Sequence, residues 1–258
     1  MGNPCDMDRV LSICQKYNLI LIEDCCESLG AAFKGKAVGT FGLAGSFSFF
    51  FSHHITTMEG GMITCNDQPL SDLFRLLRAH GWARNAKYIK PDTVDGIDPR
   101  YVFLNWGFNV RPSELQAGFG LEQLRRLPAF HAQRVANVAY FQRYLNSHSE
   151  IMRLMKVSPD ADCSWFALPI MLTPECPFKK QDFLKYLEEQ GVETRPIVAG
   201  NLTKQPVCQL FSELRKCNLP GSDAIHDRGF YLGLHPFDAT KNMDRLADLF
   251  EQFIRRNT

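Results

Sequence analysis

The sequence has almost no excess charge of either sign, because its 258 residues include 29 lysines and arginines against 28 aspartates and glutamates. This balance excludes a protein that is held to nucleic acid or to a membrane surface by bulk charge. Long apolar runs are also lacking: none approaches the roughly 18 residues of a transmembrane helix, and residues 1–6 have neither the basic nor the apolar segment of a signal peptide. We therefore expect a globular protein located in the cytoplasm.

Cysteines are present, but the spacing that metal centres use is missing. None of the nine cysteines forms a C-x-x-C pair with another. The sequence thus lacks the ligand pattern of zinc ribbons, thioredoxin-like sites and simple iron–sulfur proteins. Free, mostly buried thiols in a reducing compartment explain the cysteines best. We expect neither a metal site nor an iron–sulfur cluster.

The first 110 residues alternate between helical and strand patterns. Asp6 precedes apolar positions at helical spacing, which predicts a capped helix up to Tyr17. The apolar run 19–22 ends in Glu23 and Asp24, as expected of a buried parallel strand whose carboxyl end presents polar groups. Open α/β sheets hold their active-site residues at that end. A glycine-bearing connection then leads to two further strands and a helix, at 46–51, 61–65 and 70–80.

The second half of the chain has a different pattern. Leucines at helical spacing predict a helix from Ser113 to Pro128 and a second helix from Pro128 to His148. Strands are expected at 166–172 and 192–196, and helices at 180–190 and 244–256. The sequence therefore indicates an α/β domain over residues 1–130 and a smaller α+β domain over residues 131–258.

Three segments of the α/β part carry side chains suited to chemistry. They are an acid at a strand end in 22–27, hydroxyls alternating with phenylalanines in 46–49, and a histidine pair followed by Glu-Gly-Gly in 53–61. Each segment alone has a plain structural explanation, as a solvated strand end, a half-polar strand or a turn. The histidine pair could bind a metal, but no third ligand at helical spacing lies nearby.

Taken together and in this order, the segments resemble the sugar-aminotransferase family named after the DegT/DnrJ/EryC1/StrS proteins. The resemblance continues through Arg78-Ala79-His80-Gly81 and Gly107-Phe108-Asn109-Val110-Arg111-Pro112. It implies the aspartate aminotransferase-like α/β fold of fold type I pyridoxal phosphate enzymes. Residues 1–130 would be the C-terminal part of the cofactor-binding large domain, and residues 131–258 the small domain. Because the resemblance aligns residue 1 well inside the large domain, we expect that domain to be incomplete and the chain to be N-terminally truncated.

The resemblance also implies roles for single residues. Asp24 would face the pyridine nitrogen of the cofactor and keep it protonated, so that the ring accepts electrons. Glu27 would face the other polar edge of the ring, and Ser48 would lie on the side where the family anchors the phosphate. His53 stands where most of the family has the lysine that binds pyridoxal phosphate covalently.

The exchange of that lysine for His53 narrows the implied function. No lysine occurs between Lys36 and Lys87, so a small shift of alignment supplies no amine for a Schiff base. Histidine has an ordinary pKa of about 6.5, which suits proton transfer near neutral pH. The same exchange, in the setting His-His-x-x-Thr-x-Glu-Gly-Gly, marks the coenzyme B6-dependent 3-dehydratases that make 3,6-dideoxyhexoses.

This branch implies a lyase that uses pyridoxal or pyridoxamine phosphate, with L-glutamate as the amino donor and no iron–sulfur cluster. The expected substrate is a nucleotide-linked 4-keto-6-deoxyhexose, first of all GDP-4-keto-6-deoxy-D-mannose, on the route to colitose in lipopolysaccharide O-antigen. His53 would move the proton that allows the C3 hydroxyl to leave. The expected assembly is a homodimer with active sites at the subunit interface. Two alternatives stay open: a nucleotide-sugar aminotransferase that uses a lysine from elsewhere, and an inactive, truncated relative.

Three further residues are weaker candidates for substrate binding. Arg195, in Glu-Thr-Arg-Pro, could take the carboxylate of glutamate through a bidentate hydrogen bond, or could form a surface ion pair. Arg84 lies on a loop that in this family reaches toward the neighbouring subunit. His235 lies in a family-like segment and fits either a substrate contact or a structural role. Leu43 departs from the family pattern, which usually has a polar or acidic residue there.

Overall fold

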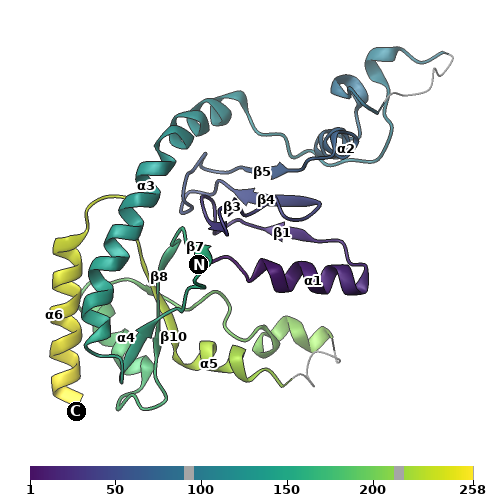
Figure 1. Ribbon diagram of the computed structural model, residues 1–258. Helices are drawn as coiled ribbons and strands as arrows, with labels where there is room; N and C mark the ends of the chain where they lie inside the picture. The colour runs from purple at the N-terminus through teal and green to yellow at the C-terminus, as the bar shows by residue number, and fades with distance from the viewer. Residues whose placement is uncertain (90–95, 212–217, 258) are drawn as a thin grey trace. The chain divides into compact units, whose positions relative to one another are not determined.

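The computed structural model describes residues 1–89, 96–211 and 218–257 (Figure 1). The chain divides into two compact units. The N-terminal unit comprises Pro4–Leu127 and Asp160–Asp162, and the C-terminal unit comprises Met1–Asn3, Pro128–Pro159 and Cys163–Thr258. Within the described ranges, no helix is both long enough and apolar enough to cross a membrane.

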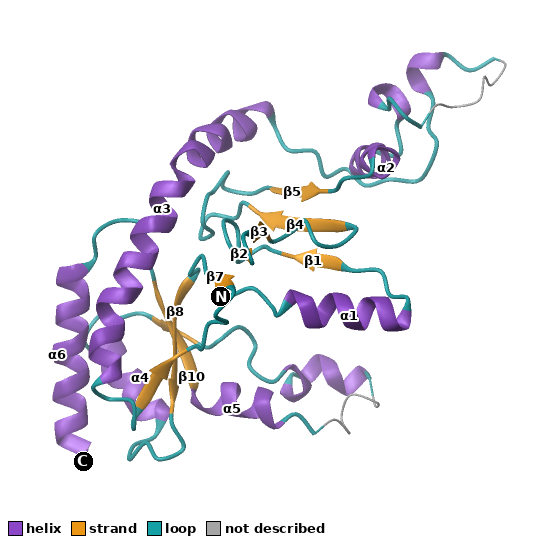
Figure 2. Ribbon diagram, in the orientation of Figure 1, coloured by secondary structure: helices purple, strands orange, loops and turns teal. Residues whose placement is uncertain are grey.

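The N-terminal unit is built on a three-stranded sheet with the order β1-β4-β5 (Figure 2). Strand β1 (Ile22–Asp24) runs parallel to β4 (Ala44–Ser48), which pairs antiparallel with β5 (Gly61–Thr64). Helix α1 (Met7–Tyr17) precedes the sheet and α2 (Gln68–Arg78) follows it. The predicted helix cap is confirmed, because the side chain of Asp6 accepts a hydrogen bond of 3.2 Å from the backbone N–H of Arg9.

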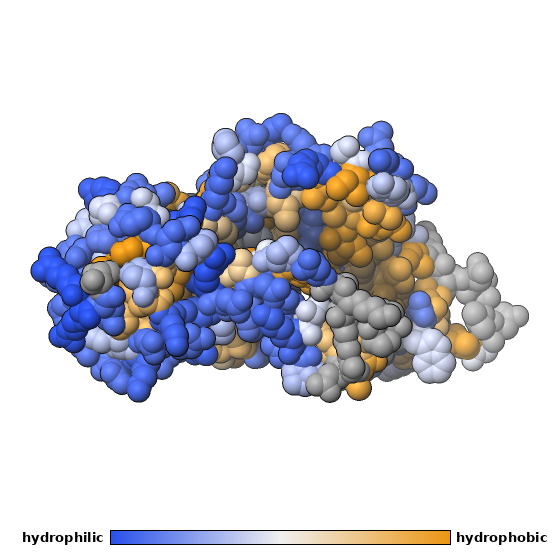
Figure 3. All heavy atoms as spheres, turned by 90° about the horizontal axis from the view of Figure 1, so that it is seen from below, coloured by the Kyte–Doolittle hydropathy of each residue, from blue (hydrophilic) through white to orange (hydrophobic). Residues whose placement is uncertain are grey.

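The predicted strand at 19–22 is wrong in both its start and its burial. The β1–β4 ladder begins at the pair Ile22–Ala44, where β4 itself starts. Ile20 and Ile22 are 77% and 67% exposed, so only Glu23 of β1 is buried. The reason is positional: β1 is an edge strand of its sheet, and an edge strand need not be covered on both faces as a central parallel strand is. Figure 3 shows hydrophobic side chains gathering on one face of the molecule.

The predicted strand over 46–51 ends three residues early. The hydroxyl of Ser48 accepts a hydrogen bond from the backbone N–H of Phe50 at 3.2 Å, which turns the chain out of the ladder after Ser48. The glycine-bearing connection before it holds a hairpin that the sequence did not predict, β2 (Ala32–Phe33) and β3 (Lys36–Ala37), which pairs with β7 (Ala161–Asp162). Its two loop residues, Lys34 and Gly35, have φ of 50° and 73°, which suits a tight hairpin turn.

The C-terminal unit has a four-stranded antiparallel sheet with the order β6-β8-β10-β9. The strands are β6 (Met152–Leu154), β8 (Ala167–Leu172), β9 (Thr194–Arg195) and β10 (Gly229–Gly233). The helices are α4 (Lys180–Glu189), α5 (Pro220–Arg228) and α6 (Thr240–Asn257). Phenylalanines of α4, β10 and α6 fill the core between these elements: Phe183, Phe230 and Phe250 are fully buried, and the rings of Phe183 and Phe250 lie 4.8 Å apart. Strand β10 and helix α5 were not predicted.

Helix α3 (Glu114–Asn146) corrects the prediction of two helices that meet at Pro128. It runs without interruption through that residue, although proline cannot donate the hydrogen bond to the carbonyl one turn earlier. The fixed φ of proline is itself helical, and the residues that follow are anchored by packing, since Val138, Phe141 and Leu145 are buried in the core of the C-terminal unit. The remaining short elements are the 3₁₀ helices η1 (Ala83–Asn85), η2 (Pro99–Tyr101), η3 (Leu202–Lys204) and η4 (Pro206–Leu210).

Candidate functional site

Asp24 and Ser46 lie opposite each other on neighbouring parallel strands. Asp24 ends β1 and is the register partner of Ser46 in β4. Because side chains alternate along a strand, Ser48 points to the same face of the sheet as Ser46. This face is opposite to the one that carries Cys25 and Phe47 into a small apolar cluster. The strand pairing therefore gathers one carboxylate and two hydroxyls, and we call this group the polar face of the sheet.

The carboxylate of Asp24 is exposed and held in its ionised form. Its Oδ1 accepts a hydrogen bond of 3.1 Å from the backbone N–H of Cys26. Hydrogen bonds from the thiol and the N–H of Cys26 lower the pKa of Asp24, and the charge of nearby His53 and the hydroxyl of Ser46 act in the same direction. Asp24 is therefore a stable negative charge at neutral pH.

The neighbouring acid, Glu23, has a different role. It is buried and points to the other side of the sheet, where its Oε2 accepts a hydrogen bond from Gly39 N–H at 2.7 Å. Its Oε1 accepts two more, from Phe41 N–H at 2.6 Å and Gly42 N–H at 2.8 Å. Glu23 thus ties β1 to the loop before β4 and fixes the strand end that carries Asp24. The sequence reasoning took Glu23 only as part of a motif, although its alternation with Asp24 already places the two acids on opposite faces.

His53 lies in the connection between β4 and β5, which internal hydrogen bonds hold in shape. The N–H of His53 donates to the carbonyl of Phe50 at 3.0 Å, and the N–H of Thr57 donates to the carbonyl of Phe49 at 2.9 Å. The ring of Phe50 meets the imidazole edge to face, with the ring centres 6.0 Å apart. The side chain of Gln116, at the start of α3, donates to the carbonyl of Glu59 at 2.8 Å and anchors the end of the connection.

One nitrogen of the His53 imidazole is buried. This atom is Nδ1, which lies within the connection, and the whole residue is half-buried. The charge of His53 contributes to lowering the pKa of Asp24, so the two side chains lie within electrostatic reach of each other. His53 is thus electrostatically coupled to Asp24, which lies on the polar face of the sheet. His54, its neighbour, is buried and belongs to the packed interior of the connection.

Glu27 and Ser48 occupy positions near the same strand ends. Glu27 is half-buried in the turn that follows β1, where Ser28 N–H donates to the carbonyl of Cys25 at 3.0 Å. The oxygen of Ser48 accepts from Phe50 N–H, so its own O–H can still donate to a ligand. Their predicted roles toward the ring edge and the phosphate stay predictions.

The weaker candidates are dispersed over the chain. Arg84 is exposed in η1, with its guanidinium carbon 5.2 Å from the centre of the Trp82 ring. Arg195, in the C-terminal unit, pairs with the carboxylate of Glu193, which is the surface ion pair that the sequence left open. His235, also in that unit, is exposed and stacks on Phe237 with ring centres 4.9 Å apart. Their predicted contacts with substrate stay predictions.

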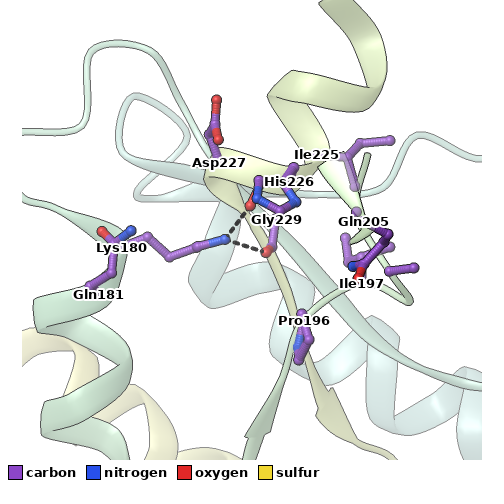
Figure 4. Close-up of a pocket in the computed structure, with 11 residues that line it drawn as sticks. Lys180, Gln181, Pro196, Ile197, Gln205, Ile225, His226, Asp227 and Gly229 are labelled. Carbon is purple, nitrogen blue, oxygen red and sulfur yellow. Dashed lines mark hydrogen bonds between the residues drawn. The ribbon is translucent and has the colours of Figure 1, made fainter. Parts of the chain in front are cut away.

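One cavity was not anticipated from the sequence. It lies in the C-terminal unit, has a volume of about 290 Å³ and is lined by α4, the end of α5 and the segment after β9 (Figure 4). The Nζ of Lys180 donates to the carbonyls of His226 at 2.5 Å and Gly229 at 3.2 Å. Burial lowers the pKa of Lys180. No sequence pattern marks this cavity, because its polar contacts are to backbone carbonyls, which every residue has.

No group of three or more histidine, cysteine, aspartate or glutamate side chains within 1–89, 96–211 and 218–257 is arranged to hold a metal ion. The cysteines described there are all free thiols. Burial raises the pKa of both Cys25 and Cys26, next to Asp24, to about 11. Both thiols are therefore protonated at neutral pH.

Comparison with known proteins places this site in context. Residues 1–251 match the model of the DegT/DnrJ/EryC1/StrS aminotransferase family. The chain is 35% identical over 257 residues to the GDP-4-keto-6-deoxy-D-mannose 3-dehydratase of Yersinia pseudotuberculosis, a match that covers 98% of this chain and 65% of the relative. It is 33% identical to the lipopolysaccharide biosynthesis protein RfbH of Salmonella typhimurium, covering 100% of this chain and 62% of that protein.

Comparison with solved structures finds the same kind of enzyme as comparison of sequences. The E. coli GDP-4-keto-6-deoxy-D-mannose-3-dehydratase with bound hydrated PLP is 32% identical and superposes with a TM-score of 0.87, over 96% of this chain and 64% of that one. A structure of GDP-4-keto-6-deoxymannose-3-dehydratase with a trapped PLP–glutamate geminal diamine gives the same identity and TM-score, over 96% of this chain and 65% of that one. The chain thus spans just under two thirds of the length of these relatives.

Proposed function

The chain belongs to the DegT/DnrJ/EryC1/StrS aminotransferase family and has its aspartate aminotransferase-like fold, and on this premise we propose that it is a 3-dehydratase of a nucleotide-linked 4-keto-6-deoxyhexose. The proposed substrate is GDP-4-keto-6-deoxy-D-mannose, the sugar in the names of its 35% and 33% identical relatives. One observation carries the proposal: a histidine, His53, lies within electrostatic reach of the ionised Asp24, in a stretch without lysine from residue 37 to residue 86.

The polar face of the sheet fits pyridoxal phosphate. Asp24 is an exposed carboxylate kept ionised, which suits the protonated pyridine nitrogen of the cofactor. Ser48 would donate its free O–H to the phosphate, and Glu27 would face the opposite edge of the ring. When bound, the cofactor supplies an electron-accepting ring that makes loss of a proton and of the C3 hydroxyl feasible. Because histidine forms no Schiff base, these polar contacts would hold the cofactor without a covalent bond.

His53 is the proposed acid–base group. Since its Nδ1 is buried in the connection, Nε2 is the atom that takes up and returns the proton. The ordinary pKa of histidine, about 6.5, allows both directions of transfer near neutral pH. The hydrogen bonds within the connection keep the imidazole in place between the two transfers.

Further parts of the proposal concern the whole protein. We place the C-terminal part of the cofactor-binding domain in residues 1–130 and the small domain in residues 131–258. The amino donor would be L-glutamate, which restores the amino form of the cofactor after each turnover. The enzyme would act in the cytoplasm as a homodimer, in the colitose branch of O-antigen synthesis, with Arg84, Arg195 and His235 as candidate contacts to substrate or glutamate.

The experiment is to incubate the protein with pyridoxal phosphate, glutamate and GDP-4-keto-6-deoxy-D-mannose, and to measure 2-oxoglutarate and loss of the C3 hydroxyl by NMR. His53→Asn should lower the turnover about 10²- to 10⁴-fold, the usual contribution of an acid–base group. His148→Gln, in a histidine that pairs with Glu251 in the C-terminal unit, is the matched control and should keep the turnover.

Two results would overturn the proposal. One is full turnover in His53→Asn, and the other is no dehydration of any 4-keto-6-deoxy nucleotide sugar by the intact protein. Reduction with borohydride distinguishes the proposed dehydratase from the alternative, an aminotransferase that binds the cofactor through a lysine. A stable pyridoxyl-lysine in the unmodified protein would support the alternative, whereas we expect such an adduct at residue 53 only in His53→Lys.

A further inference from the structure

Gln116 lies in the first turn of α3 and forms hydrogen bonds in two directions. Its Oε1 accepts from the backbone N–H of Ser113 at 2.8 Å and from the Ser113 hydroxyl at 3.1 Å. The backbone N–H of Gln116 donates to that hydroxyl at 3.3 Å. This reciprocal arrangement is a capping box, which stabilises the start of a helix. The other end of the side-chain amide, Nε2, is directed to the connection between β4 and β5.

The Nε2 atom of Gln116 binds the last part of this connection. It donates to the carbonyl of Glu59 at 2.8 Å and to the carbonyl of Thr57 at 3.5 Å. Between these two carbonyls lies Met58, whose φ of 68° is a left-handed conformation that residues with a Cβ adopt at a cost. Such a conformation persists where the surrounding contacts hold it. Gln116 provides two of these contacts.

Helix α3 approaches the connection closely on the face that carries Gln116. Gln116 and Gly120 lie one turn apart and are half-buried, whereas the three residues between them are exposed. A Cβ atom added to Gly120 would lie 2.8 Å from Cγ2 of Thr57. The glycine therefore lets the helix come close to Thr57, and this places Gln116 within reach of the carbonyls on both sides of Met58.

The anchored segment is bonded to the start of the connection that contains His53. The N–H of Thr57 donates to the carbonyl of Phe49 at 2.9 Å, and the N–H of Phe49 donates to the carbonyl of Gly60 at 2.9 Å. The N–H of His53 donates in turn to the carbonyl of Phe50, the next residue, at 3.0 Å. A shift of the segment around Thr57 would therefore move the residues that hold His53.

We propose that Gln116 is a positioning residue for His53. The proposal rests on the proposed function, in which His53 moves the proton. By holding the turn at Met58, Gln116 keeps the imidazole at the distance and angle that proton transfer requires. A misplacement of about 1 Å can cost roughly a hundredfold in rate. Loss of the hydrogen bond from Gln116 to Glu59 should therefore slow the turnover and leave substrate binding nearly unchanged.

The test uses Gln116→Glu, which separates the two sets of hydrogen bonds. A carboxylate still accepts from Ser113, so the capping box is kept, but it has no N–H to donate to Glu59. We expect kcat to fall about tenfold and KM for the nucleotide sugar to stay within about twofold. Combined with His53→Asn, the same substitution should cause no further loss, because a residue that acts through His53 then has no imidazole to position.

Amide hydrogen exchange provides a second measurement, which does not depend on turnover. The N–H of Thr57 should exchange about tenfold faster in Gln116→Glu than in the unmodified protein, because the segment that holds it opens more often. The N–H groups of β8 and β10, in the C-terminal unit, should keep their exchange rates.

Ser113→Ala is the matched control. It removes the hydroxyl of the capping box but leaves the bonds from Gln116 to the connection, so the melting temperature should fall while kcat is kept. Three results would overturn the proposal: Gln116→Glu keeps either the kcat or the slow exchange of the unmodified protein, it slows His53→Asn as much as it slows the unmodified protein, or Ser113→Ala loses as much kcat. Faster exchange at Thr57 in Gln116→Glu, together with no dehydration by the unmodified protein, would uphold the anchoring by Gln116 and refute the proposed function.

Discussion

The charge of His53 helps to keep the carboxylate of Asp24 ionised. The two residues are separated by strand β4, and Asp24 reaches the site from the end of β1 while His53 reaches it from the connection after β4. The pairing with Ser46 fixes the position of Asp24, and the hydrogen bonds of the connection fix that of His53. An acid that stays negative thus lies within electrostatic reach of an imidazole from another segment of the chain.

Replacement of Asp24 tests the cofactor contact. Asp24→Asn should weaken binding of pyridoxal phosphate roughly tenfold to hundredfold, since a hydrogen bond to a charged group contributes about 1.5–3 kcal/mol. A spectroscopic titration with the cofactor measures the change. Asp8→Asn, at an exposed acid that pairs with Lys34, is the control and should bind the cofactor normally. Unchanged binding in Asp24→Asn would remove Asp24 from the site.

Glu23 should matter for stability rather than for chemistry. Glu23→Ala leaves three backbone N–H groups without their acceptor inside the N-terminal unit, and we expect a loss of about 3 kcal/mol or more in the free energy of unfolding. Urea denaturation measures this loss. The exposed Glu122, replaced by alanine, should change the free energy by no more than about 0.5–1 kcal/mol. Equal effects of the two substitutions would contradict the structural role of Glu23.

The lowered pKa of Asp72 predicts how the stability of the protein changes at acidic pH. Backbone N–H groups, first that of Tyr88, lower its pKa below the ordinary value of 3.8. On acidification the unfolded chain takes up this proton first, so the stability that Asp72 contributes is complete above pH 3.8 and is lost as the pH falls through the lowered pKa. Unfolding midpoints in urea, measured from pH 5 downward, should fall less steeply in Asp72→Asn. Identical slopes for the variant and the unmodified protein would argue against this assignment.

The two thiols beside Asp24 should react slowly. Burial raises the pKa of Cys25 and Cys26 to about 11, and only the thiolate is a good nucleophile. Mass spectrometry after brief treatment with iodoacetamide at pH 7.5 should therefore show labelling of the exposed Cys5 well before that of Cys25 or Cys26. Unfolding in urea should abolish the difference. Early labelling of Cys26 in the folded protein would contradict the prediction.

The core of the C-terminal unit depends on its phenylalanines. Phe250 is fully buried and packs against Phe141 and Phe183 with ring centres 5.8 Å and 4.8 Å away. Phe250→Ala should lower the free energy of unfolding by about 3–5 kcal/mol, because it removes apolar contacts and leaves a cavity. Thermal or urea denaturation followed by circular dichroism measures it. Phe211→Ala, at an exposed ring, should change stability by about 0.5 kcal/mol at most.

Local pattern predicted most of the helices but only about half of the strands, and not what happens where two segments meet. The Asp6 cap of α1 depends on neighbouring residues, and the prediction was correct. The end of β4 at Ser48 depends on a hydroxyl that accepts the N–H of Phe50, and Pro128 continues a helix because packing anchors its far end. The cavity at Lys180 is lined by segments as far apart in sequence as α4 and the end of α5, and no short motif links them.

The candidate site shows the same limit. The resemblance supplied Asp24, Ser48 and His53, and pairing within the sheet explains how Asp24 and Ser48 share a face. The three hydrogen bonds that bury Glu23 come from backbone N–H groups of the loop 39–42. Backbone groups carry no residue-specific signal, so the local pattern alone did not show that the loop binds Glu23.

The order of the two acids in β1 also favours the correct register of β1 against β4. If β1 slipped by one residue against β4, every side chain would change faces. The N–H groups of Gly39, Phe41 and Gly42 would then lose Glu23 as their acceptor, and the shorter side chain of Asp24 would take its place on that face. The order Glu-Asp thus makes the shifted register less stable than the observed one. A protein without Glu23 would lose this difference in stability.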